Sequence, residues 1–169
     1  MRTILTVAVL VVFSATLTAA DTKFESKEGK YSAKFPGEEK PKTISQKAGG
    51  LDLYITIVEK GKGGYAVIYS DVTPDVVKAA PAAQLLAGGQ KGLEDNFKAK
   101  ITKSGEAKVL ANGKEYPARD ILAEKEEMHL RIMLILVDNR LYQVFVVGSK
   151  ELVSGPDADA FIKSFELAK

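Results

Sequence analysis

His129 is the one histidine of this sequence, and acidic residues lie close to it along the chain. Successive residues of a strand face opposite sides, so a strand through this segment would place Glu127 and His129 on one face. An imidazole beside a carboxylate could act as a general base or bind a divalent metal ion weakly. One hypothesis is therefore a small metal-dependent hydrolase that uses His129 and Glu127. A metal site needs further ligands, which the sequence does not place nearby, so an exposed histidine at the start of a strand is the favoured interpretation.

The residue types exclude several other chemistries. The 169 residues include no cysteine, which excludes thiol catalysis, disulfides and cysteine-ligated metal centres. No serine lies in a Gly-x-Ser-x-Gly motif, and Ser104-Gly105 and Ser154-Gly155 are typical of turns. Gly61, Gly63 and Gly64 do not have the spacing of a phosphate-binding loop. We therefore expect no enzyme activity, no catalytic residue, no cofactor and no resident metal.

A weak candidate surface for a ligand or partner can be assembled from aromatic and charged residues. Two tyrosines on neighbouring predicted strands could share a face, and amphipathic side chains of this kind are favoured in binding sites. A second group lies beside Pro117, which cannot donate to a strand ladder and so predicts a sheet edge or a bulge. The alternatives are ordinary sheet packing for the tyrosines and ion pairing for the charged residues. The candidate residues are Tyr54, Tyr69, Tyr116, Arg119, Asp120 and His129.

Most of the candidate residues lie in segments that are predicted to be strands. Alternating apolar and polar residues and the turns between them predict strands at 24–27, 31–35, 51–59, 65–72, 101–110 and 114–124, with a weaker candidate at 43–47. The two most apolar runs predict further strands at 128–137 and 141–148. Asn112-Gly113 suits a type I′ hairpin turn, because both central residues of that turn need a positive φ. Apolar spacing predicts helices at 81–99 and from 156 onward, and a short helix after Thr73-Pro74.

The segment 130–137 is apolar at nearly every position, so both of its faces should be covered. Two amphipathic helices are available to cover it. We therefore expect an α+β fold in which a largely antiparallel sheet is sandwiched between helices, an α/β/α arrangement. No repeat or linker divides residues 21–169, which we interpret as one domain.

Residues 1–20 have the anatomy of a signal peptide. Arg2 is followed by the apolar run 4–13, and small residues precede Asp21. We expect cleavage after Ala20, because this apolar run is too short to span a bilayer. The chain left after cleavage has no second apolar stretch long enough for a membrane span. The protein is therefore expected to be exported to a periplasm or the extracellular space.

Four segments, in order, resemble the PsbP-like superfamily, which includes a photosystem subunit, a Ran-binding import factor and many bacterial exported domains. The residues that carry the resemblance are Phe24, Ser26, Gly29, Tyr31, Ser32, Phe35, Pro36 and Gly37; Gly113, Tyr116, Pro117, Ala118 and Arg119; Leu141, Tyr142, Gln143, Val144, Val146 and Gly148; and Phe161, Ile162, Ser164 and Phe165. The resemblance implies an antiparallel sheet covered by helices. It also implies action by binding a partner or stabilising an assembly rather than by a shared catalytic centre, and it transfers no functional residue.

These observations predict an exported, non-enzymatic binding or assembly-stabilising domain of the cell envelope. Its partner would be another envelope protein or a small ligand. Nucleic acid is not an expected partner, because 24 Lys and Arg stand against 22 Asp and Glu and the lysines are scattered among acids.

Overall fold

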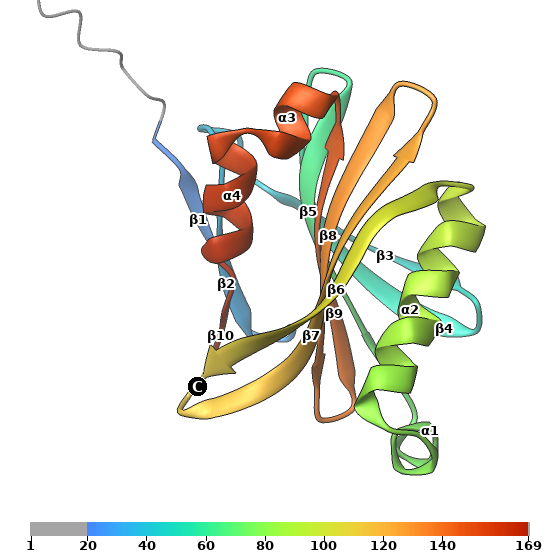
Figure 1. The fold of residues 1–169 in the computed structure, drawn as a ribbon. Coiled ribbons are helices and arrows are strands. Elements are labelled where there is room, and N and C mark those ends of the chain that lie inside the picture. The colour runs from blue at the N-terminus through green and yellow to red at the C-terminus, as the bar shows by residue number, and fades with distance from the viewer. Residues whose placement is uncertain (1–19, 169) are drawn as a thin grey trace, which may run out of the picture.

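A computed structural model describes residues 20–168 as a mixed α and β structure with antiparallel sheets. The main sheet has seven strands (Figure 1). In order across the sheet they are β3 (Lys42–Ala48), β4 (Leu51–Lys60), β5 (Gly63–Asp71), β9 (Arg140–Gly148), β8 (Met128–Val137), β7 (Lys114–Lys125) and β6 (Lys100–Ala111). Every neighbouring pair is antiparallel, as the sequence predicts.

A second, three-stranded sheet and four helices complete the described chain. The small sheet has the order β1 (Thr22–Ser26), β2 (Tyr31–Phe35) and β10 (Glu166–Leu167). The helices are α1 (Pro74–Ala79), α2 (Ala82–Phe97), α3 (Lys150–Ser154) and α4 (Pro156–Lys163). Neither α3 nor β10 is predicted from the sequence, because both are too short for a periodic pattern. The predicted signal peptide falls almost wholly on residues 1–19, outside the described residues.

The turns explain why the late strands form consecutive hairpins. Asn112 and Gly113 both have positive φ, 52° and 77°, so the predicted hairpin turn between β6 and β7 is confirmed. Asp138, with φ 53°, opens the turn between β8 and β9. Each turn brings consecutive apolar strands into antiparallel register.

Side chains from the two faces of the main sheet form two separate core clusters. On one face, Leu86 and Leu93 of α2 are buried in one cluster with Ile132 and Leu134 of β8. Gly89 lies where an added Cβ would be 3.4 Å from Leu134, so this glycine lets α2 lie close to the sheet. The long helix predicted at 81–99 is therefore present, and Gly88-Gly89 does not break it.

The opposite face is covered by a mixed layer (Figure 1). Phe161 of α4 and Tyr31 and Phe35 of β2 are fully buried there, with Ile135 of β8 in the same cluster. The predicted burial of 130–137 on both sides is confirmed. The expected pair of helical layers differs from the structure in one respect: the second layer combines α3 and α4 with the small sheet, whose strands supply much of its aromatic surface.

Pro117 lies where β7 is locally an edge. β7 pairs with β8 only from Ala118 onward, whereas its pairing with β6 continues through Pro117, opposite Lys108. Pro117 is therefore paired with β6 but not with β8, which suits a residue without a backbone donor. The predicted local edge is present. The register irregularity of this hairpin lies elsewhere, between Ile101 and Lys103.

Candidate functional site

The structure divides the six candidate residues among three places. Tyr54 and Tyr69 lie together on β4 and β5. Tyr116 and Arg119 line a cavity beside α2. Asp120 and His129 line a separate hollow that also includes residues of α3. The six residues therefore do not form one site.

Tyr54 and Tyr69 form a stacked pair. They are directly opposite each other in the β4–β5 register, their ring centroids are 4.8 Å apart, and their planes differ by 14°. The Arg140 guanidinium lies 4.7 Å from the centroid of the Tyr69 ring, a cation–π contact. Tyr69 is buried in the core cluster that includes Tyr31. These contacts give the pair a packing role, whereas its use in binding stays a prediction.

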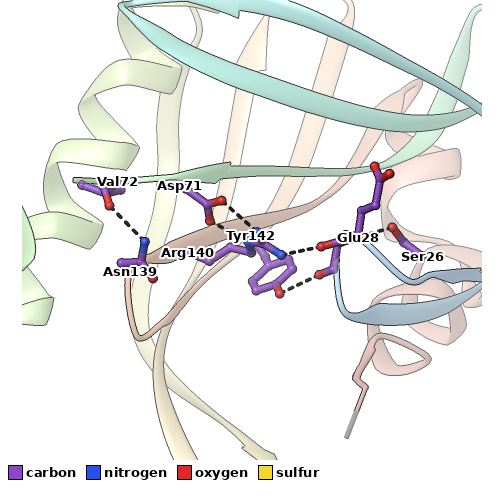
Figure 2. A network of polar contacts seen from close by, with 8 residues as sticks. Ser26, Glu28, Asp71, Val72, Asn139, Arg140 and Tyr142 are labelled. Atoms are coloured by element: carbon purple, nitrogen blue, oxygen red, sulfur yellow. Dashed lines mark hydrogen bonds and ion pairs between the residues drawn. The ribbon is translucent and has the colours of Figure 1, made fainter. Parts of the chain in front are cut away.

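Arg140 is the centre of a polar junction that the sequence analysis missed (Figure 2). Its Nε and Nη2 donate to the two carboxylate oxygens of Asp71, at 2.6 and 2.8 Å, and its Nη1 donates to the carbonyl of Glu28 at 2.8 Å. The hydroxyl of Tyr142 donates to the buried carbonyl of Gly29 at 2.7 Å. The junction therefore ties the turn between β1 and β2 to the main sheet.

The electrostatics of this junction follow from its contacts. Hydrogen bonds from Arg140 lower the pKa of Asp71, and the same contact raises the pKa of Arg140. Burial raises the pKa of Tyr142. An added Cβ at Gly29 would lie 2.6 Å from the Tyr31 ring and 2.7 Å from Ser26 Oγ, so only glycine fits this turn. Each of these observations describes a satisfied structural contact rather than an open reactive site.

A cavity of about 660 Å³, here called the α2 cavity, lies between the start of α2 and the outer half of the β6–β7 hairpin. Its apolar lining residues are Ala83, Leu86 and Pro117, together with Ala107, Tyr116 and Ala118, whose side chains pack in the core cluster of the opposite face. Its charged lining residues are Glu106, Lys108, Glu115 and Arg119. Lys108 and Glu115 form an ion pair at 2.7 Å. The α2 cavity is thus an apolar space with charged groups around it.

Arg119 is a charged residue of the α2 cavity whose guanidinium is held by a hydrogen bond to α2. Its Nη1 donates to Gln90 Oε1 at 3.0 Å, and Ser104 Oγ donates to the same oxygen at 2.7 Å. Its Nε is buried and has no hydrogen-bond partner within residues 20–168. Glu106 is opposite Arg119 in the β6–β7 register, yet no ion pair joins them in the described chain. An unpaired buried donor beside an open space is a feature of a binding site.

The hollow of about 430 Å³ that holds Asp120 and His129 opens on the face of β7 opposite to Arg119. Arg131, which also lines it, is ion-paired with Asp159 of α4. Asp120 Oδ1 is buried without a partner in the described part of the chain. This hollow has less apolar wall than the α2 cavity and more charged side chains.

The predicted pairing of Glu127 with His129 on a strand face is wrong. Glu127 lies in the turn between β7 and β8, where Glu126 has φ 54°, so the alternation of a strand does not apply to it. The residue directly opposite His129 is Glu124. Among residues 20–168, no three His, Asp or Glu side chains are grouped so as to hold a metal ion.

Comparisons with known proteins support the fold. No family model matches the sequence, and no curated protein matches it. Among solved structures, the cyanobacterial PsbP protein CyanoP of Synechocystis sp. PCC 6803 matches with a TM-score of 0.61 and 13% identity, covering 90% of this chain and 95% of that one. A protein of unknown function from Pseudomonas aeruginosa, a putative regulator, matches with a TM-score of 0.39 and 12% identity, covering 80% of this chain and 87% of that one. The match to CyanoP confirms the PsbP-like fold expected from the sequence.

Proposed function

From the PsbP-like fold and the α2 cavity, we propose that the protein is an exported, non-enzymatic binding domain of the cell envelope. Residues 21–169 would act as one domain, in a periplasm or outside the cell. The occupant of the α2 cavity would be a small ligand or part of another envelope protein. The observation that carries this proposal is the α2 cavity itself, with its unpaired Arg119 Nε.

The size and lining of the α2 cavity suit a ligand. Binding pockets for small molecules have volumes of about 300–1,000 Å³, mostly apolar walls and a few polar groups that orient the ligand. The α2 cavity has about 660 Å³, and Leu86 and Pro117 are among its apolar walls. The pairing of β7 with β8 ends at Ala118 and Ile135, so the outer end of the β6–β7 hairpin, which forms one wall, is not paired with β8.

Export is supported by the composition of residues 1–20. In the part of the chain described here, no helix has both the length and the apolar character needed to cross a membrane. Sequencing the N-terminus of the protein recovered from fractionated cells tests this step. We expect an envelope or secreted fraction and a first residue of Asp21; an intact chain in the cytoplasm would contradict export.

The positions of Glu127 and Arg119 favour a binding function over hydrolysis. The alternative, a metal-dependent hydrolase that uses Glu127 and His129, needs the two side chains on one strand face. The turn position of Glu127 gives that arrangement no support. Arg119, whose Nε has no hydrogen-bond partner in residues 20–168, instead lies on the other face of β7, beside the larger and more apolar space.

A pair of matched variants tests whether the α2 cavity is the binding site. Ala83→Trp would place a large side chain at the cavity wall, whereas Gln84→Trp adds the same side chain at the next residue, which is exposed and does not line the cavity. Tagged full-length chains would be produced in the source cell and recovered from its envelope, and co-purifying proteins and small molecules would be quantified by mass spectrometry.

We expect one component that is recovered with the wild-type chain and with Gln84→Trp but is lost with Ala83→Trp. Recovery of every component equally with both variants, or of none with the wild-type chain, would contradict the proposal.

A further inference from the structure

We infer that the α2 cavity binds a small apolar monocarboxylate, whose carboxylate is held by Arg119. This inference rests on the proposed function, in which the α2 cavity is the binding site. It adds the chemical class of the ligand and the residue that recognises it.

Arg119 and Arg140 differ in one respect that identifies the ligand group. Arg140 uses the edge of its guanidinium formed by Nε and Nη2 to hold both carboxylate oxygens of Asp71. The bidentate match of a planar guanidinium to a planar carboxylate is the strongest and most specific contact that arginine makes. The corresponding edge of Arg119 is not filled in this way. Its Nε has no partner among residues 20–168, and Nη1, which is not part of that edge, makes the bond to Gln90.

Arg119 is also held in position before any ligand arrives. Gln90 belongs to α2 and accepts hydrogen bonds from Arg119 and from Ser104 of β6 through the same oxygen. This contact restrains the guanidinium through Nη1 and does not use Nε. A group that is ordered in advance loses less conformational entropy on binding.

The rest of the cavity suits an apolar body and a single negative charge. Ala83, Leu86 and Pro117 are among the walls and offer apolar contact to a hydrocarbon chain. Lys108 is ion-paired with Glu115, which reduces its attraction for a second anionic group. Glu106, opposite Arg119, would repel a second negative charge on the ligand. The cavity is therefore expected to select a monocarboxylate over a dicarboxylate or a phosphate.

Isothermal titration of the purified, processed protein with octanoate and with octanol tests this inference. We expect octanoate to bind at least about tenfold more tightly than octanol, because only the acid can use a charged bidentate contact. Succinate and inorganic phosphate should bind more weakly than octanoate. A tripeptide ending in leucine with a free carboxylate provides a protein-like probe, and tighter binding of that peptide than of octanoate would overturn the assignment to a small acid.

Variants identify the residue that recognises the carboxylate. Arg119→Lys keeps the charge but removes the bidentate edge, and it should weaken octanoate binding about tenfold while leaving octanol binding unchanged. Glu106→Gln should strengthen octanoate binding, a change that loss of folding cannot produce. Equal octanoate affinity in the wild type, Arg119→Lys and Glu106→Gln would overturn the inference.

The same variants separate this inference from the proposed function. If Ala83→Trp releases an envelope component but octanoate does not bind the wild-type protein, the α2 cavity is the binding site and the carboxylate assignment is wrong. If octanoate binds with the expected dependence on Arg119, the inference is supported whatever envelope protein is recovered.

Discussion

Replacing Tyr142 by phenylalanine tests the junction that ties the β1–β2 turn to the main sheet. The ring of Tyr142 is fully buried and would remain in place, whereas the hydroxyl that donates to the Gly29 carbonyl would be lost. The substitution therefore removes one hydrogen bond and creates almost no cavity.

The expected loss of unfolding free energy follows from the backbone carbonyl that Tyr142→Phe leaves without a donor. The Gly29 carbonyl would be left buried without its partner, which costs about 1–3 kcal/mol of unfolding free energy. For a chain of this size, Tm should fall by roughly 2–4 °C for each kcal/mol lost. Urea denaturation followed by circular dichroism measures the free energy, and a thermal scan measures Tm.

Tyr65 supplies a matched control. Its hydroxyl is also buried but has no hydrogen-bond partner in residues 20–168, and burial raises its pKa to about 12. Tyr65→Phe removes a buried hydroxyl that has lost its hydrogen bonds to water without gaining one in the protein, so the free energy of unfolding should be unchanged or slightly higher. If Tyr142→Phe costs no more than Tyr65→Phe, the importance assigned to the junction is refuted.

Three further substitutions test other parts of the account. Asp71→Asn removes the carboxylate held by Arg140. This ion pair lowers the pKa of Asp71 in the folded state, so its contribution to the free energy of unfolding is present above about pH 4 and is lost as the pH falls through the lowered pKa. The side chain of Asp71 is 48% exposed, so we expect Asp71→Asn to lower the free energy of unfolding by about 1 kcal/mol or less at pH 7, and by less in acid. Urea denaturation of the wild type and the variant from pH 7 to pH 3 measures this difference, and a difference that stays constant with pH would contradict the prediction. Gly63→Ala would place a Cβ 2.2 Å from the Val147 carbonyl oxygen across the β5–β9 pair, so we expect the free energy of unfolding to fall by about 1–3 kcal/mol. Urea denaturation measures this loss, and an unchanged free energy would show that the two strands are not so close. His129→Ala should change stability by no more than about 0.5 kcal/mol in thermal scans with or without divalent ions, whereas loss of a tightly held metal with this variant would revive the hydrolase hypothesis.

The strands and their hairpins were predictable because their signals are local. Alternation of side chains predicts which residues are strands, and the Asn112-Gly113 turn fixes the partner of β6. The apolar run at 130–137 predicts a strand covered on both faces, which the two core clusters confirm. These features depend on residues close together in the sequence.

The functional geometry was less predictable because it depends on pairing between distant segments. Asp71 and Arg140 end and begin strands that are adjacent only once β5 pairs with β9. Likewise, Gln90 and Arg119 meet only because α2 lies on β7 and β8. The sequence analysis named Arg119 for its place beside Pro117, but nothing local to that segment showed the cavity next to it. Glu127 was misplaced because the strand pattern was extended into a turn.

The α2 cavity as the binding site is tested most directly by photo-crosslinking in living cells. A photoreactive benzoylphenylalanine at position 83 would line the cavity, and one at position 84 would not. After irradiation, mass spectrometry of the recovered chain should show an adduct from position 83 and none from position 84. Adducts of equal yield at both positions, or at position 84 alone, would contradict binding in the α2 cavity.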